Sequence, residues 1–222
     1  MSQDQWTAVD QYFADLLIPS DATLDAALAD SAAAGLPPIN VAPNQGKLLY
    51  LLAKLHGTRT ILEIGTLGGY STIWLARALP VDGRLVTLEV DALHANVARS
   101  NIARAGLADR VELRLGRAID LLPELAAERR EPFDFIFIDA DKVSAADYFT
   151  WSLKLSRPGT VILVDNVVRE GEVINAESSD ASVQGVRRLN QLLAAEKRVT
   201  ATAIQTVGSK GYDGFALAIV TE

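Results

Sequence analysis

The chain of 222 residues contains no cysteine and only two histidines. Without cysteine there can be no disulfide bond, thiol nucleophile or zinc-thiolate site, and nothing in this composition indicates secretion. Basic residues are also scarce, 21 against 28 acidic ones, and the formal net charge of −7 argues against nonspecific binding to nucleic acid or an anionic membrane. No apolar run is long enough to span a bilayer, and the N-terminus lacks the pattern of a signal peptide. These absences predict a soluble, cytoplasmic protein.

Apolar residues make up 49% of the chain, enough for one well-buried core. Helical spacing predicts two N-terminal helices, over 3–17 and 21–34, the second capped by Ser20. A third helix is expected to be capped by Asn44 and to carry an apolar face formed by Leu48, Leu49, Leu51, Leu52 and Leu55.

From Thr60 onward, short apolar strands alternate with helical segments. This order predicts a parallel sheet covered by helices on both faces. The strands are expected at 60–64, 84–89, 111–115, 133–138 and 160–164, and the helices at 70–79, 92–105, 117–130 and 144–156.

The C-terminus departs from this alternation. Two strand patterns, Val199 to Val207 and Phe215 to Val220, are joined by G-S-K-G-Y-D-G, which is too short for a crossover helix. They are therefore expected to form an antiparallel hairpin. A seven-stranded, mostly parallel sheet with such an ending resembles the Rossmann-like class I methyltransferase fold. We expect one α/β domain over 1–222, with an N-terminal helical cap region at 1–56 and the Rossmann-like core at 57–222.

The segment Thr60 to Ser71, T-I-L-E-I-G-T-L-G-G-Y-S, predicts a strand, a glycine turn and a helix N-terminus. Such a turn lets bare backbone approach a ligand. It lacks the G-x-G-x-x-G of a dinucleotide site and the G-K-[ST] of a P-loop, and it contains no Lys or Arg. Glu63, just before the turn, suggests a ligand with positive charge, an amine or a sulfonium. S-adenosylmethionine carries both.

Glu89 ends the second strand, where an acid can accept hydrogen bonds from both ribose hydroxyls of an adenosine-containing ligand. Glu89 alone does not separate the methyl donor from a dinucleotide, but its combination with Glu63 favours the methyl donor. The alternative is that both acids only cap strands.

Acidic and amide side chains follow the fourth and fifth strands. Asp139 comes directly after one, and Asp165 and Asn166 after the other. Two carboxylates and an amide at neighbouring strand ends suit a hard divalent cation, Mg²⁺ above all, or Mn²⁺ or Ca²⁺. The alternative is an acidic cluster that caps helices and binds nothing.

Five motifs in this order resemble the metal-dependent O-methyltransferases of the catechol and caffeoyl-CoA type, particularly their small bacterial members. The resemblance runs from Ile39 to the C-terminus. The motifs are E-I-G-T-L-G-G-Y-S at 63–71, L-E-V-D at 88–91, F-I-D-A-D-K at 137–142, V-D-N at 164–166 and D-G-F at 213–215.

The resemblance implies an S-adenosylmethionine-dependent enzyme that forms a homodimer and methylates one hydroxyl of a small catechol-like substrate. Lys142 matches the general base, and Asp139 acts beside it as a metal ligand with Asp165 and Asn166. The residues that would bind the methyl donor are Ile39, Val41, Glu63, Gly65, Ser71, Glu89, Ala118, Asp139 and Asp141.

A coenzyme A thioester is less supported as the substrate, because Ser182, Val183 and Gln184 stand where plant relatives place aromatic residues. Arg169 and Lys210 could each bind an anionic tail or be ordinary surface charges. Both histidines, His56 and His94, are expected to be surface or helix-end residues.

Three alternatives remain. The first is a transfer-RNA methyltransferase of the same fold acting on hydroxyuridine, against which the acidic balance counts. The second is a nicotinamide-dependent oxidoreductase, which would need a glycine pattern that is absent. The third is a non-catalytic protein that binds an adenosine-containing ligand.

Overall fold

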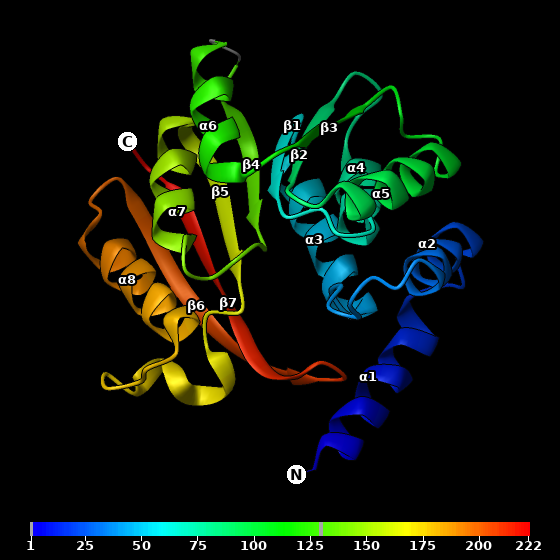
Figure 1. The fold of residues 1–222 in the computed structure, drawn as a ribbon, viewed down its shortest axis with the longest axis horizontal. Coiled ribbons are helices and arrows are strands. Elements are labelled where there is room, and N and C mark those ends of the chain that lie inside the picture. The colour runs from blue at the N-terminus through cyan, green and yellow to red at the C-terminus, as the bar shows by residue number, and fades with distance from the viewer. Residues whose placement is uncertain (1, 129–130) are drawn as a thin grey trace.

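The computed structural model of the chain describes residues 2–128 and 131–222, and its strands form one seven-stranded sheet in the order β3-β2-β1-β4-β5-β7-β6 (Figure 1). Strands β1 to β5 run parallel, and β7 runs antiparallel to both β5 and β6. This confirms the expected mostly parallel sheet with an antiparallel C-terminal hairpin. The strands are β1 Thr60–Ile64, β2 Arg84–Glu89, β3 Val111–Leu115, β4 Phe133–Ile138, β5 Ser156–Asp165, β6 Val199–Gly208 and β7 Gly211–Val220.

Helices cover both faces of the sheet, α6, α7 and α8 on one side and α3, α4 and α5 on the other (Figure 1). Successive strand residues point to opposite faces, so Leu62 and Ile64 pack in one apolar cluster and Ile61 in the other. The helical elements are α1 Gln3–Leu17, α2 Ala22–Ala33, α3 Pro43–His56, α4 Tyr70–Ala78, α5 Ala92–Arg104, α6 Ala118–Ala127, α7 Ala145–Lys154, the 3₁₀ segment η1 Arg169–Ile174 and α8 Ala181–Ala195.

The N-cap of α2 differs from the sequence-based expectation, which placed it at Ser20. Asp21 caps the helix instead, and its Oδ1 accepts hydrogen bonds from the backbone N–H groups of Thr23 and Leu24. The same carboxylate pairs with Arg77 on α4, a tertiary contact that holds it in the capping position. Within residues 2–128 and 131–222, no helix combines the length and apolar character that a membrane span requires.

The expected cap of α3 is also wrong. Pro43 is the first helical residue and Ala42 the N-cap, without a side-chain hydrogen bond. Asn44 instead donates from Nδ2 to the backbone oxygen and Oδ1 of Asp10 on α1, both at 3.3 Å. Its amide therefore joins two helices rather than ending one.

The leucine face of α3 is only partly buried. Leu49 is inaccessible to solvent, whereas Leu51 and Leu55 are 44% and 85% exposed. The helix packs on α4 through a narrower face, where a Cβ added at Gly46 would lie only 2.4 Å from Trp74 Cδ1. On this narrower face Leu52 still packs against the core, whereas Leu51 and Leu55 point toward solvent.

The last three strands are longer than their apolar runs. β5 begins at Ser156, not at residue 160, because Ser156 still pairs with Phe133. The β6–β7 ladder continues to the pair Gly208–Gly211, so the turn contains only Ser209 and Lys210. Ladder hydrogen bonds need no apolar side chains, which is why the expected seven-residue connection is mostly strand. The helix expected over 117–130 ends at Ala127, and its residues 129–130 lie outside the described part of the chain.

Candidate functional site

A cavity of about 670 Å³ opens where the strand order reverses, at the carboxyl ends of β1, β2 and β4. In open α/β sheets this switch point is the usual place for a ligand. We refer to it as the first cavity. The residues anticipated from the sequence that line it are Ile39, Val41, Gly65, Ser71, Glu89, Ala118, Asp139, Asp141, Lys142 and Asn166.

The glycine turn after β1 has the strained backbone that its sequence suggests. Gly65 and Gly69 have φ of 100° and 83°, and Leu67 has φ of 50°. A Cβ at Gly65 would lie 2.1 Å from the carbonyl oxygen of Asp139. Glycine therefore lets the ends of β1 and β4 approach each other closely, and this closeness brings the turn beside Asp139.

Glu63 does not lie where a direct contact with a ligand would require. Its side chain is fully buried, and it is not among the residues that line the first cavity. The carboxyl group accepts hydrogen bonds from the hydroxyls of Ser71, at 2.6 Å, Thr72 and Thr87, and burial raises the pKa of Glu63 to about 7. Through these hydrogen bonds Glu63 connects the end of β1 to α4 and positions Ser71, which lines the cavity.

Glu89 lines the first cavity and also holds its wall together. Its Oε2 accepts hydrogen bonds from the backbone N–H groups of Thr66 (3.2 Å) and Leu67 (2.8 Å). Its Oε1 accepts from Val90 and Asp91, each at 2.9 Å. Four such bonds fix the carboxylate at the end of β2 and fix the glycine turn beside it.

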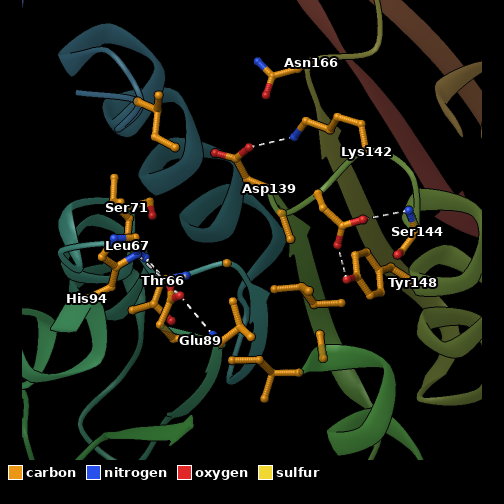
Figure 2. Close-up of a pocket in the computed structure, with 18 of the residues that line it drawn as sticks. Thr66, Leu67, Ser71, Glu89, His94, Asp139, Lys142, Ser144, Tyr148 and Asn166 are labelled. Carbon is orange, nitrogen blue, oxygen red and sulfur yellow. Dashed lines mark hydrogen bonds and ion pairs between the residues drawn. The ribbon is translucent and has the colours of Figure 1, made fainter. Parts of the chain in front are cut away.

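His94, expected to be a surface or helix-end residue, lies in the first turn of α5 and also forms part of this wall. It lines the first cavity, and its Nδ1 lies 3.6 Å from Glu89 Oε1 (Figure 2). The available signal was its position in the first turn of α5, whose N-cap Asp91 follows directly on the Glu89 strand. A side chain in the first turn of α5 can reach back to Glu89 at the end of β2.

The opposite wall carries Ser144 and Tyr148 (Figure 2), and Asp141 lines the cavity with them. The Asp141 carboxylate accepts hydrogen bonds from the Tyr148 hydroxyl and from the Ser144 backbone N–H, the latter at 2.9 Å. Tyr148 is buried, and burial followed by the hydrogen bond to Asp141 raises its pKa. Tyr148 therefore orients the Asp141 carboxylate.

Asp139, Lys142, Asp165 and Asn166 gather beside the first cavity. Lys142 Nζ donates to Asp139 Oδ1 at 2.9 Å (Figure 2). Asp165 is buried, and that burial together with the neighbouring Asp139 carboxylate raises its pKa to about 7. Gln45, which sequence reasoning missed, donates from Nε2 to Asp165 Oδ2 at 2.7 Å.

This cluster contains oxygen donors of the kind that hard cations prefer. Two neighbouring carboxylates repel each other, and Lys142 supplies only one positive charge beside them. Within the described residues, no group of three or more His, Cys, Asp or Glu side chains is placed to hold a metal. Asp139, Asp165 and Asn166 instead offer two carboxylates and one amide, and the chemistry of these donors fits a divalent cation.

Comparison with known proteins gives consistent matches over nearly the whole chain. Residues 21–219 match the O-methyltransferase family. A catechol O-methyltransferase of Niastella koreensis is 56% identical, over 99% of this chain and 100% of that protein. The crystal structure of an O-methyltransferase from Bacillus cereus in complex with SAH has a TM-score of 0.98 and 63% identity, covering 99% and 100% of the two chains. The O-methyltransferase TomG from Streptomyces achromogenes, in complex with SAM, has a TM-score of 0.97 and 55% identity, covering 100% of both.

Proposed function

The chain belongs to the O-methyltransferase family and is an S-adenosylmethionine-dependent enzyme, and on that premise we propose that it methylates one hydroxyl of a small catechol-like acceptor with the help of a divalent cation. The observation that carries this proposal is the gathering of Asp139, Lys142, Asp165 and Asn166 at the edge of the first cavity. The name of the Niastella koreensis relative supports the acceptor class.

The methyl donor occupies the first cavity in this proposal. Glu89 receives the ribose hydroxyls, and Ala118 lies at the adenine, as the family motif implies. Gly65 and Ser71 contact the amino acid end beside Asp139. Ile39 and Val41, before α3, cover the donor. Asp141, oriented by Tyr148, adds an acceptor for an N–H group.

Asp139, Asp165 and Asn166 would hold the cation, with Mg²⁺ the first expectation. When bound, such a cation supplies positive charge that lowers the pKa of a nearby hydroxyl. Gln45 and the Asn166 backbone N–H each donate to an oxygen of Asp165 and so fix its orientation.

Lys142, as the neutral amine, accepts the proton of the attacking hydroxyl at Nζ. Its hydrogen bond to Asp139 Oδ1 holds the amine at the edge of the first cavity, where the donor's methyl group would lie. Because a sulfonium methyl is already activated, the remaining task is to place oxygen and methyl in line, which the rigid ends of β4 and β5 serve.

Replacing Glu89 with alanine is expected to weaken binding of S-adenosylmethionine by about 1.5–3 kcal/mol, the scale of lost charge-assisted hydrogen bonds. The change removes the ribose acceptors and also frees the four backbone N–H groups that Glu89 now binds. Calorimetric titration measures the affinity, and thermal unfolding without donor reports the loosened turn. Glu89→Gln is the matched variant that keeps the size of the side chain. Unchanged donor affinity in Glu89→Ala would reject the assignment of Glu89 as the residue that binds the ribose.

A catechol is expected to react with a kcat/KM on the order of 100-fold above that of the matched monophenol, because a misplacement of about 1 Å can cost that much in rate. Two neighbouring oxygens fit the cluster of Asp139, Asp165 and Asn166, whereas one oxygen leaves the ring misaligned. The assay compares 3,4-dihydroxybenzoate with 4-hydroxybenzoate. Equal kcat/KM for the two acceptors would reject the catechol-like acceptor class but would not affect the assignment of the methyl donor site.

The enzyme is proposed to act as a homodimer that buries one face of α1. This helix has no buried residue. Its apolar side chains repeat at helical spacing, are 45–63% exposed and form one stripe, made of Val9, Tyr12, Phe13, Leu16 and Leu17. Light scattering is expected to give the mass of two chains, and Leu16→Glu to shift it to one. A wild-type monomer at assay concentration would contradict the proposal.

A further inference from the structure

A second cavity, of about 270 Å³, lies between the N-terminal helices and the C-terminal hairpin. Asp165 and Asn166 line it, and Asn166 lines the first cavity too. The two cavities therefore meet at the proposed metal ligands. If the donor fills the first cavity, an acceptor whose hydroxyls lie at this junction places the rest of its ring in the second.

The walls of the second cavity suit an aromatic ring with a short substituent. Leu48 from α3, Val207 from β6 and Phe215 from β7 supply apolar surface. Ligand sites combine such surfaces with a few polar groups that set orientation and specificity. The charged groups of this cavity should therefore distinguish between acceptors.

Two of the acidic residues in this cavity are committed to the fold. Asp10 accepts from the Ser209 backbone N–H at 2.7 Å through Oδ2 and from Asn44 through Oδ1. Asp213 Oδ1 accepts from the backbone N–H groups of residues 168–169, each at 3.0 Å. These hydrogen bonds hold the carboxylates in place as structural groups.

Lys210 differs from these acids. It is the only cationic side chain among the described residues that line the second cavity, and it occupies the two-residue hairpin turn. Its Nζ donates to the Pro38 carbonyl oxygen at 2.8 Å, and partial burial of the ammonium lowers its pKa. An ammonium has three N–H donors, and the described bond goes to an uncharged oxygen. An anionic ligand group would accept hydrogen bonds from the remaining N–H donors.

We propose that Lys210 determines acceptor specificity by binding an anionic substituent, so that the preferred acceptors are vicinal dihydroxy aromatics carrying a carboxylate on the ring or on a short side chain. This inference rests on the proposed function, because the junction of the two cavities orients the acceptor. It assigns Lys210 a role in substrate recognition and none in the chemical step.

The test compares 3,4-dihydroxybenzoate with its neutral analogue 3,4-dihydroxybenzamide. Wild-type enzyme is expected to prefer the carboxylate in kcat/KM by about tenfold, the scale of one charge-assisted hydrogen bond. Lys210→Gln should bring the ratio close to one, Lys210→Glu should favour the amide, and Lys210→Arg should retain the preference. Lys197→Gln, which removes an equal charge from an exposed position outside both cavities, should leave the ratio unchanged.

A ratio in Lys210→Gln equal to that of wild type overturns the proposal. The proposal is also overturned if Lys210→Gln lowers kcat/KM equally for both acceptors and raises the KM for the donor. That result would mean that Lys210 only holds the Pro38 segment in place. Calorimetric titration of both acceptors into the complex with S-adenosylhomocysteine measures the same preference without turnover. Lys210-dependent binding without methylation would reject the proposed function and keep this inference. Methylation of both acceptors at equal rates would reject this inference and keep the proposed function.

Discussion

Removing divalent cations is expected to lower the rate of methyl transfer to a catechol by about 1,000-fold, because charge stabilisation by a bound cation is worth several kcal/mol and each 1.4 kcal/mol is about tenfold in rate. Adding Mg²⁺ or Mn²⁺ to the chelated enzyme should restore the activity. The physical basis is the pair Asp139 and Asp165: Asp165 is buried next to the Asp139 carboxylate, and Lys142 offsets only one of the two negative charges.

Donor binding provides the internal control for this experiment. Glu89, Ala118 and the glycine turn lie in the first cavity and do not depend on the cation, so calorimetry should show nearly unchanged affinity for S-adenosylmethionine after chelation. Asp165→Asn should reproduce the loss of activity, whereas Asp147→Asn, a substitution of an acid outside both cavities, should not. Full activity in metal-free buffer would exclude the metal-assisted mechanism.

Replacing Lys142 with methionine is expected to lower kcat by 10²–10⁴-fold, roughly the contribution of a positioned general base. The affinity for S-adenosylmethionine should stay within about twofold, because Lys142 acts on the acceptor hydroxyl. A loss of catalysis lowers kcat, whereas a loss of donor binding would raise KM, so the two effects can be told apart. Single-turnover rates and donor titrations on the same preparation give both quantities. Lys197→Met controls for the loss of a surface charge.

Lys142→Arg separates a base from a purely electrostatic group. Arginine keeps the positive charge beside Asp139 but remains protonated and cannot accept a proton. If Lys142 is the base, the arginine variant should be nearly as inactive as the methionine variant. Recovery of most of the activity with arginine would instead show that the charge alone matters.

The regular elements were largely predictable from the sequence. The ranges of β1 to β4 and of α1 agree with the structure, because each is encoded by local periodicity and bounded by turn residues. The glycine turn was equally predictable, since only glycine permits the close approach of β1 to Asp139. The order of the motifs placed Asp139, Asp165 and Asn166 at adjacent strand ends, which the sheet order confirms.

Tertiary packing decided the features that local patterns cannot encode. Glu63 follows the strand pattern correctly, but only the packing of α4 shows that its carboxyl points to Ser71 and Thr72 rather than into the cavity. Gln45 reaches Asp165 across 120 positions of sequence, and no periodicity connects the two.

The C-terminal hairpin shows the same division. Its existence followed from a connection too short for a helix, whereas its register followed from backbone pairing down to Gly208 and Gly211. That register places Lys210 at the tip, against Pro38 and beside the second cavity. The sequence by itself thus determined most of the elements, the glycine turn and the strand-end positions of the proposed oxygen ligands, because these depend on neighbours along the chain. Only the tertiary structure decided which side chains from distant segments share a cavity, because that depends on how the helices and the hairpin pack.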